Sequence, residues 1–559
     1  MSANQYDVVV IGSGASGLTC ATVAQQKGLR CLLVEKAGQL GGTTAYSGGG
    51  VWIAGNPHMH QSGASDSRAD AKAYLSAVLG NHYDELLIEA FLDSGPEMVS
   101  YMEGNTQVRF FSIPLSDYRP EFPGAKLGRT MLTQEYDGRA LGGWLRKLRL
   151  PLPGYVAFGS MQTDPQHLAK LKQAFRSWEG FRFSAGRFAA FLRDLVQYGR
   201  GANLANGNAL VGRLLRSALD AGVEIWPASP AVRLLHDDAQ GVAGVVVRRP
   251  DGSEVEITAS KGVVLASGGF GSNQAMIEQF MPMPGVHTAI SPESNTGDGL
   301  AMGQAAGGIL PEPNPDNGIW SPVSLVRDRS GKLRSIFPHF GPDRGKPGTI
   351  IVAPDGKRFA NEASPYQDFT NVMHRLGIGT AWLVFDHRML RNYGVGVALP
   401  APLPYRQHVR SGYLKVADSI GELAARIGVD RAALKATVEE FNRHARNGKD
   451  PAFNRGGNIY DNAQGDFEHR PNPNLAPVEV GPFYAVEIHP GNVSSLYGFS
   501  TTPDAQVMNR DRQPIPGLYA VGLDQNSLMK GFYPGGGSSL GPGMTFAYRA
   551  ALHMAGQTG

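Results

Sequence analysis

The sequence predicts an α/β protein in which one domain is discontinuous along the chain and a second, α+β domain is inserted into it. Three observations lead to this prediction. A strand–helix–strand pattern with a glycine-rich turn opens the chain. Short apolar segments that end in glycine recur at 223–269 and again at 517–524. Between about 311 and 476 the composition changes, with more proline, charged and aromatic residues.

The opening pattern has every part of a nucleotide-binding β-α-β unit. A short β-branched run at Val8–Ile11 is typical of a buried parallel strand. A helical pattern follows, and a second strand at Cys31–Val34 ends at an acidic residue, Glu35. The turn carries a G-x-G-x-x-G motif at Gly12, Gly14 and Gly17. These parts in this order predict a Rossmann-like domain.

Each residue of the motif has a separate physical role. We expect Gly12 to permit the tight turn, Gly14 to let the backbone approach a pyrophosphate, and Gly17 to let the helix pack on the strand. The helix N-terminus would face the anion, and Glu35 would accept hydrogen bonds from a ribose diol. Ser16 and Lys36 complete this part of the predicted cofactor site.

A second series of small residues distinguishes FAD from a nicotinamide cofactor. It follows the second strand and reads GGTTAYSGGG. A nicotinamide enzyme has no need of this segment, whereas the ribityl chain and isoalloxazine of a flavin run along backbone beyond the first β-α-β unit. We therefore predict that FAD is bound there by Gly42, Thr43, Thr44, Ser47, Gly48 and Gly49.

Later segments return to the same domain. A hairpin is predicted around Asp251-Gly252, then a buried strand at Gly262–Ala266. Another strand lies at Gly517–Asp524, and a helix at Ser538–Met554 begins near Gly541. The further predicted cofactor residues are Val232, Ser267, Gly268, Gly522, Asp524, Ser539 and Leu540.

These segments define the predicted domains. The FAD-binding domain comprises residues 1–310, with an insertion at about 130–205, and residues 477–559. Residues 311–476 form the inserted substrate, or capping, domain, with a helical stretch at Ser419–Arg446. The chain of 559 residues is long enough for both domains.

Charge and cysteine content limit the partners and the location. Lysine and arginine number 52 against 49 acidic residues and form no basic stripe, so nucleic acid is not an expected partner. The two cysteines, Cys20 and Cys31, indicate a reducing compartment. The sequence shows no signal peptide and no apolar run of about 18 residues. We expect a cytoplasmic protein without an integral membrane segment or a metal site, and peripheral membrane association stays open.

Together the motifs resemble the fumarate reductase / 3-ketosteroid Δ1-dehydrogenase superfamily of flavoproteins. The resemblance runs nearly end to end and is weakest at roughly 130–205. It rests on GSGASG, GGTTAYSGGGVWI, ASGGF, GKRFANE, GPFYA, GLYAVG and YPGGGSSLGPGMTFAYRAA. It implies non-covalent FAD, because Thr43 stands near the place of the histidine to which some members attach the flavin.

Within the superfamily, the motifs favour the ketosteroid dehydrogenases. Dicarboxylate-reducing members place an arginine in N-E-x-x-x-R-D, where this chain has Tyr366. Their C-terminal glycine loop carries a histidine and an arginine, where this chain has Tyr533 and Gly537. A dianion would therefore lack a bidentate partner. A D-Y-x-P-E segment at Asp117–Glu121, like that of the dehydrogenases, adds Tyr118.

The resemblance implies FAD-dependent α,β-desaturation (1,2-dehydrogenation) of a cyclic ketone, foremost a 3-ketosteroid. The hydroxyl of Tyr533 and the N–H of Gly537 would bind the ketone oxygen where enolate charge develops. Tyr366, as tyrosinate or through a shared proton, would take the α-proton with help from Tyr118. The flavin would take the β-hydride and pass its electrons to an unidentified acceptor.

Three alternatives remain at this point. A smaller cyclohexanone-type ketone is the substrate if the pocket is filled by Phe110, Phe111, Met161, Trp320 and Phe499. An ene-reductase would run the same chemistry in reverse. A protein that holds a flavin without catalysis would not need the tyrosines.

Overall fold

A large mixed sheet carries the N-terminal nucleotide-binding unit in the computed structural model, which describes residues 4–164, 167, 177–237, 241–283, 285–328, 330–341 and 343–557. Its strand order is β19-β20-β11-β1-β2-β8, and β10 and β9 extend it from β11. The strands are β1 (Gln5–Ile11), β2 (Cys31–Val34), β8 (Glu224–Trp226), β9 (Ala231–Asp237), β10 (Gly241–Arg248), β11 (Glu254–Leu265), β19 (Gln506–Met508) and β20 (Pro514–Ala520).

Strand β1 lies between β2 and β11 and pairs with both in parallel. Its side chains alternate between two hydrophobic cores: Val8 and Val10 face one, whereas Val9 and Ile11 face the other. A strand buried on both faces explains the continuous β-branched run of the sequence. The structure contains the strand predicted at Val8–Ile11. It also contains the hairpin at Asp251-Gly252, between β10 and β11, and the later strands β11 and β20, which pair in parallel.

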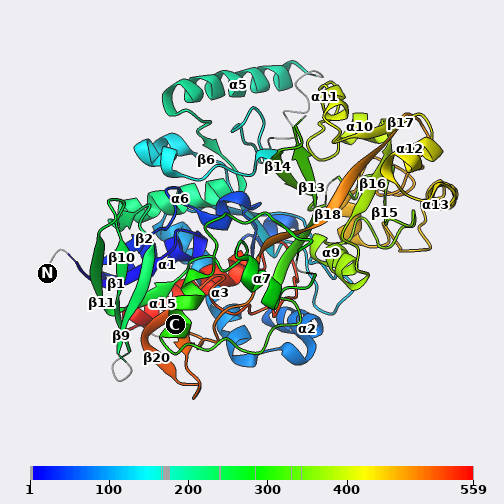
Figure 1. Cartoon of the computed structure of the whole chain (residues 1–559). Helices are drawn as coiled ribbons and strands as arrows, with labels where there is room; N and C mark the ends of the chain where they lie inside the picture. Colours follow the sequence, from blue (N-terminus) through cyan, green and yellow to red (C-terminus); the bar gives the residue numbers. More distant parts are fainter. Residues whose placement is uncertain are drawn as a thin grey trace.

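Three helices cover one face of this sheet. Helix α1 packs against α6 and α15, and all three contribute to the same hydrophobic core (Figure 1). Their bounds are α1 (Ala15–Gln26), α6 (Asn206–Ala221) and α15 (Leu540–Met554). Helix α15 comes from the end of the chain, so this domain is discontinuous in sequence, as predicted.

A second sheet forms the other half of the molecule, on the right of Figure 1. Its order is β14-β13-β18-β16-β15, with β12 and β17 paired to β18. The strands are β12 (Thr288–Ala289), β13 (Gly318–Arg327), β14 (Leu333–Pro338), β15 (Thr349–Val352), β16 (Ala381–Asp386), β17 (Lys415–Ala417) and β18 (Phe483–Ser495).

The position of β18 differs from the predicted domain division. The sequence returns to the FAD-binding domain at residue 477, but β18 pairs with β13 along one edge and with β16 along the other. Because β18 pairs within the second sheet, the chain returns to the FAD-binding domain only after Ser495, not at residue 477. A sequence pattern could not locate this return, because both sheets use short apolar strands.

The helical stretch predicted at Ser419–Arg446 is two helices. Helix α12 (Ile420–Ile427) ends at Gly428, whose φ of 72° is left-handed, and α13 (Arg431–Ala445) begins after Asp430 caps it. The other helices are α2 (Arg68–Leu79), α3 (Glu85–Asn105), α5 (Trp178–Tyr198), α7 (Gln274–Phe280), α8 (Asp298–Ala305), α9 (Tyr366–Arg375), α10 (His387–Tyr393), α11 (Arg406–Arg410) and α14 (Ile459–Gln464).

The remaining elements surround the cofactor domain. They include 3-10 turns, a small sheet of β3, β4 and β5, and the pair β6–β7. Their bounds are β3 (Val51–Trp52), β4 (Phe110–Ser112), β5 (Thr130–Thr133), β6 (Tyr136–Asp137), β7 (Asn203–Leu204), η1 (Gly42–Tyr46), η2 (Met59–Ser62), η3 (Gly80–His82), η4 (Gly138–Lys147) and η5 (Pro153–Tyr155).

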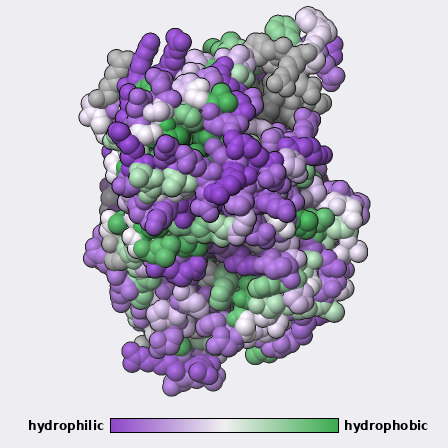
Figure 2. Space-filling model, turned by 90° about the vertical axis from the view of Figure 1, so that its right-hand side faces the viewer, coloured by the Kyte–Doolittle hydropathy of each residue, from purple (hydrophilic) through white to green (hydrophobic). Residues whose placement is uncertain are grey.

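The surface is polar over much of the second sheet. Figure 2 shows this face as mostly hydrophilic, with separate hydrophobic areas. Among the described residues, no helix has the length and apolarity needed to cross a bilayer.

Candidate active site

A cavity of about 330 Å³ opens where β1, β11 and β20 end. Its walls come from the turn before α1, the η1 segment, the loop before α8 and the glycine loop before α15. Parallel strands present their carboxyl ends at one edge of a sheet, so segments far apart in sequence meet there.

The glycines of the first turn have the predicted geometry. Gly12 has φ of 113°, and a Cβ there would lie 2.1 Å from the Ala266 oxygen. A Cβ on Gly17 would lie 2.0 Å from the Gly12 oxygen, so close packing of α1 on β1 requires glycine at both positions. At Gly14 the nearest atom is Thr44 Oγ1, 3.7 Å away, so this glycine leaves open space in the cavity rather than packing against protein.

Glu35 ends β2 inside this cavity and is 8% exposed. Its Oε2 accepts hydrogen bonds from the Ser13 N–H at 3.0 Å and from Ser13 Oγ at 2.6 Å. Its Oε1 accepts one from the Ala37 N–H at 2.8 Å. These donors hold the carboxylate beside the G-x-G-x-x-G turn, where the ribose of a dinucleotide would lie.

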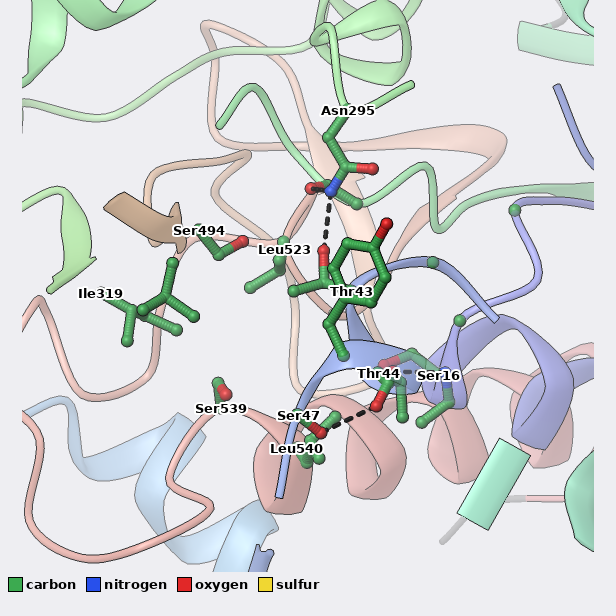
Figure 3. A pocket seen from close by; sticks show the side chains of 18 of the residues that line it. Ser16, Thr43, Thr44, Ser47, Asn295, Ile319, Ser494, Leu523, Ser539 and Leu540 are labelled. Carbon is green, nitrogen blue, oxygen red and sulfur yellow. Dashed lines mark hydrogen bonds between the residues drawn. The ribbon is translucent and has the colours of Figure 1, made fainter. Parts of the chain in front are cut away.

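The η1 segment forms the next wall. Thr44 Oγ1 accepts the N–H of Ala15 at 3.1 Å, which fixes η1 against the start of α1. Ser47 Oγ donates to the Thr44 carbonyl at 2.8 Å (Figure 3). No atom lies within 4 Å of where a Gly48 Cβ would be. The open space at Gly14 and Gly48 gives a flavin chain direct access to the backbone, so these residues fit FAD.

Asn295 is a lining residue that the sequence did not reveal. Its Nδ2 donates to Thr43 Oγ1 at 2.8 Å and to the Gly268 carbonyl at 2.9 Å, and Figure 3 shows the amide pointing toward Thr43. It therefore ties η1 to the turn after β11. The only local signal was its place two residues before the Gly297-x-Gly299 pair.

Most of the predicted cofactor residues line this one cavity: Gly12, Gly14, Ser16, Gly17, Glu35, Lys36, Gly42, Thr43, Thr44, Ser47, Gly48, Gly49, Ser267, Gly268, Gly522, Ser539 and Leu540. Two do not. Val232 follows the lining residue Ala231 but lies outside the cavity wall. Asp524 is fully buried and accepts hydrogen bonds from Ser267 Oγ at 3.0 Å and the Gly269 N–H at 3.2 Å. It therefore stabilises the turn after β11 without lining the cavity.

The predicted catalytic residues meet at one part of the cavity. Tyr366, Tyr533 and Gly537 line it, and Tyr118 lies directly behind them. The ring centroids of Tyr366 and Tyr533 are 5.8 Å apart, and that of Tyr118 is 5.9 Å from Tyr366 and 6.0 Å from Tyr533. Tyr460, which the sequence did not single out, lies 4.9 Å from Tyr118.

The glycine loop brings a hydroxyl and an amide together. Gly537 has φ of 98°, and a Cβ there would lie 2.4 Å from the Gly50 carbonyl. The Tyr533 hydroxyl lies 3.5 Å from Ser539 Oγ and interacts with the backbone of Gly537. Glycine at 537 is required by this close approach and by its left-handed backbone.

Salt bridges and backbone hydrogen bonds position the tyrosines. Arg119 pairs with Asp368 at 2.6 Å, which ties the segment of Tyr118 to the first turn of α9, where Tyr366 is the first residue. The Tyr118 N–H donates to the Pro534 carbonyl at 2.8 Å, next to Tyr533. The three tyrosines are thus connected through their backbones as well as their rings.

Burial dominates the titration of this cluster. It raises the pKa of Tyr118 and of Tyr366 well above the ordinary value. Tyr118 and Tyr533 raise the pKa of Tyr366 further, whereas the pKa of Tyr118 is raised by Tyr460 and Tyr533 and lowered by its hydrogen bond with Tyr366. Burial also raises the pKa of Tyr533, against hydrogen bonding from Ser539. In the protein without substrate, all three phenols are therefore neutral at neutral pH.

Much of the cavity lining is apolar, and Phe340 lies next to Tyr366, with 4.8 Å between ring centroids. The apolar lining includes Ile113, Leu115, Leu132, Leu152, Ile290, Ile319, Phe340 and Val493. The charged lining residues Glu35, Lys36 and Asp298 lie instead by the first β-α-β turn, and Lys36 pairs with Asp298 at 2.7 Å.

The large residues that could have filled the pocket do not line it. Phe110, Phe111, Met161, Trp320 and Phe499 are absent from the described wall of the cavity. Phe499 is fully buried in the core of the large sheet, where its ring occupies the space beside Gly303. Phe499 therefore does not fill the pocket, because its side chain packs in this core instead.

Comparison with known proteins agrees with this geometry. Residues 7–540 match a family model described as FAD binding domain. The chain is 37% identical over 561 residues to 4-oxocyclohex-2-ene-1-carboxylate 5-dehydrogenase from Sinomonas cyclohexanicum, covering 98% of this chain and 93% of that one. It is 36% identical over 583 residues to 3-oxosteroid 1-dehydrogenase from Mycobacterium tuberculosis (strain ATCC 25618 / H37Rv), covering all of both.

A solved structure is similar over the whole chain. The 3-ketosteroid delta1-dehydrogenase from Sterolibacterium denitrificans, in complex with 1,4-androstadiene-3,17-dione, has a TM-score of 0.90 and 36% identity and covers 99% of this chain and 100% of that one. The resemblance inferred from the motifs is confirmed, and FAD is the cofactor. The chain belongs to the FAD-binding-domain family of flavoproteins.

Proposed function

We propose that this flavoprotein desaturates a cyclic ketone between its α- and β-carbons, and that the ketone is a neutral polycyclic compound such as a 3-ketosteroid. One observation carries the proposal. Tyr366, Tyr533 and Gly537 line the same flavin cavity, with the two rings 5.8 Å apart between centroids, together with aliphatic side chains and Phe340. The relatives named as 3-oxosteroid 1-dehydrogenases support the same reaction class.

In this proposal the ketone oxygen accepts hydrogen bonds from the Tyr533 hydroxyl and the Gly537 N–H. Donors that the fold holds in place stabilise developing enolate charge without reorganisation. Such a donor contributes roughly 3–4 kcal/mol to transition-state stability. Tyr366, 5.8 Å away from Tyr533 between ring centroids, takes the α-proton. Bound FAD supplies the acceptor for the β-hydride.

The neutral phenols favour one of the two forms expected for the base. Because the pKa of Tyr366 is raised well above its ordinary value, tyrosinate is disfavoured in the resting protein. A shared proton is more consistent with this cluster: Tyr366 accepts the α-proton as its own hydroxyl proton shifts to Tyr118.

Charge distribution favours a neutral substrate. The wall beside Tyr366 and Tyr533 has no charged residue among the described lining residues, and burying an unpaired carboxylate costs several kcal/mol. A steroid ketone would place apolar rings against Ile113, Leu132 and Val493 instead.

A cyclohexanone carboxylate is the second candidate. The Sinomonas relative is named for such a substrate, and one cation lies nearby. The guanidinium of Arg149 is 5.6 Å from the ring centroid of the lining residue Tyr46, and no acidic residue pairs with it in the described chain. If the carboxylate ketone is the substrate, Arg149→Ala will raise its KM without changing kcat.

Anaerobic mixing with candidate ketones tests the proposal. The flavin absorbance should bleach with androst-4-ene-3,17-dione and remain with 4-oxocyclohexanecarboxylate. Bleaching by the carboxylate alone would select the second candidate, and no bleaching with either would reject the reaction. Turnover with a dye acceptor, against reduction of an enone by dithionite-reduced protein, determines the direction. Repeated turnover with the dye would also indicate that an external electron acceptor reoxidises the flavin.

We also propose peripheral contact with a membrane surface through α5. Its solvent side carries apolar side chains at helical spacing that are 40–91% exposed: Trp178, Phe181, Phe188, Leu192 and Val196. Figure 1 shows α5 at the periphery of the molecule. Sedimentation with lipid vesicles should decrease for Leu192→Glu, with flavin content unchanged.

A further inference from the structure

Three consecutive glycines precede α15, and the last of them carries the Gly537 N–H that we assign to the ketone oxygen. Glycine imposes little preference on its own backbone, so neighbouring groups must fix the direction in which each of these peptides points. The Gly535 carbonyl accepts a hydrogen bond from Ser538 Oγ at 2.6 Å, within the loop itself. The peptide between Gly536 and Gly537 is instead held from outside the loop.

Thr130 holds that peptide. It is the first residue of β5, lines the cavity and is 4% exposed. Its Oγ1 donates to the Gly536 carbonyl at 2.9 Å. A Cβ on Gly536 would lie 3.4 Å from the same Oγ1, so the loop packs directly against β5. Trp52 lies opposite Thr130 on the neighbouring strand β3, and its N–H donates to the next carbonyl, that of Gly537, at 3.2 Å.

Fixing the Gly536 carbonyl also fixes the direction of the Gly537 N–H. The two groups belong to one planar peptide, which is trans in this structure, and a trans peptide points its C=O and N–H in opposite directions. With the carbonyl oxygen on Thr130, the N–H is directed away from β5. Rotation of this peptide by half a turn would put its carbonyl oxygen in the place of the N–H, and that oxygen would repel the ketone oxygen.

We propose that Thr130 is a positioning residue for the reaction: its hydroxyl holds the peptide between Gly536 and Gly537 so that the Gly537 N–H meets the ketone oxygen. This inference rests on the proposed function. Thr130 takes no part in proton or hydride transfer. Its hydrogen bond to the carbonyl also polarises the amide, which makes the N–H a better donor. The loss of the hydroxyl should therefore be detected at the substrate carbonyl as well as in the rate.

Two variants of Thr130 separate the hydroxyl from the rest of the side chain. Thr130→Val removes the hydroxyl and keeps the shape, whereas Thr130→Ser keeps the hydroxyl. Flavin bleaching of each holoenzyme is measured under anaerobic conditions at saturating androst-4-ene-3,17-dione. We expect Thr130→Val to bleach roughly tenfold more slowly than the wild type, the factor that one lost hydrogen bond produces, and Thr130→Ser to stay within about threefold. If Thr130→Val does not retain FAD, Thr130→Ala provides the same comparison.

Infrared difference spectra distinguish positioning from a general loss of stability. The probe is 1,4-androstadiene-3,17-dione, isotopically labelled at the conjugated carbonyl carbon and bound to the oxidised holoenzyme. Hydrogen bonds to a carbonyl oxygen lower its stretching frequency. In the wild type and in Thr130→Ser the labelled band should therefore lie below its frequency in an aprotic solvent. In Thr130→Val it should shift back toward the solvent value, because the Gly537 N–H no longer points at the oxygen.

Thr133→Val is the matched control. Thr133 belongs to the same strand and is 1% exposed, and its Oγ1 makes no hydrogen bond within the described part of the chain. Its bleaching rate and band position should equal those of the wild type.

Two results would overturn the role of Thr130. One is an unchanged band in Thr130→Val, even if bleaching slows, because lower stability alone does not move a carbonyl frequency. The other is a Thr130→Ser variant that behaves like Thr130→Val, because the hydroxyl would then not be the group that matters. A wild type that neither bleaches nor shifts the carbonyl band would instead reject the proposed function.

Discussion

Removing the hydroxyl of Tyr533 separates its catalytic role from its structural one. The hydroxyl lies 3.5 Å from Ser539 Oγ, which is a weak contact. The ring contacts with Tyr118 and Tyr366, at 6.0 and 5.8 Å between centroids, do not depend on it. Tyr533→Phe should therefore change the free energy of unfolding by less than about 1 kcal/mol.

The transition state should lose much more. If the hydroxyl is one of the donors to the ketone oxygen, its removal costs about 3–4 kcal/mol, or a roughly 10²- to 10³-fold decrease in the rate of flavin bleaching at saturating ketone. Stopped-flow absorbance under anaerobic conditions measures this rate directly. The concentration of ketone that gives half the maximal rate should change much less.

Tyr497→Phe supplies the opposite signature. Tyr497 is 3% exposed and donates to the Pro311 carbonyl at 2.6 Å, away from the cavity. Its loss should reduce stability by about 1 kcal/mol and leave bleaching unchanged. If Tyr533→Phe bleaches within about threefold of the wild type while retaining FAD, the assignment of Tyr533 as an oxyanion donor is refuted.

Three further changes test other parts of the structure. Glu35→Ala should weaken FAD binding about 10- to 100-fold, measured by flavin fluorescence during reconstitution, because it removes a charged acceptor beside the first turn; unchanged affinity would contradict the ribose contact. Glu362→Ala should reduce the free energy of unfolding, measured in urea, by about 3–5 kcal/mol, because it leaves the buried Arg455 guanidinium without the carboxylate that lies 3.3 Å away. A loss below about 1 kcal/mol would contradict this reasoning and show that the residues around Arg455 rearrange to compensate. Burial lowers the pKa of His287 to about 4 and that of His374 to about 3. Below pH about 6.5 the unfolded chain therefore binds more protons at these two residues than the folded protein does. The melting temperature should fall between about pH 7 and pH 5 by more in the wild type than in the His287→Asn, His374→Asn double variant. Equal falls would show that other groups control acid stability.

Local patterns were sufficient for the cofactor half of the site. The roles of Gly12, Gly17 and Glu35 depend on residues within one β-α-β unit, so spacing alone predicts them. Their geometry is as expected, including the positive φ of Gly12 and the close approach of Gly17 to its oxygen. The segment 42–49 follows the same rule, because it continues directly from the second strand.

Contacts over long sequence separations were not predictable in this way. Asn295 bonds to Thr43 across 252 residues, and no local pattern distinguishes it from an ordinary loop asparagine. Tyr460 was missed for the same reason, because only the packing of α14 brings it to Tyr118. Phe499 was also misjudged, because only the packing of the large sheet shows that its side chain lies in the core.

By itself, the sequence determined the α/β class, the discontinuous nucleotide-binding unit and the choice of FAD, because these follow from short-range steric rules for glycine, strand and helix. The tyrosines were identified through family resemblance, and their roles remain a proposal. Only the tertiary structure decided that residues 118, 366 and 533 share one cluster, that the cavity beside it has an apolar lining and that β18 belongs to the second sheet. The physical reason is that proximity and burial are properties of packed elements, and packing joins segments whose separation along the chain carries no information about it.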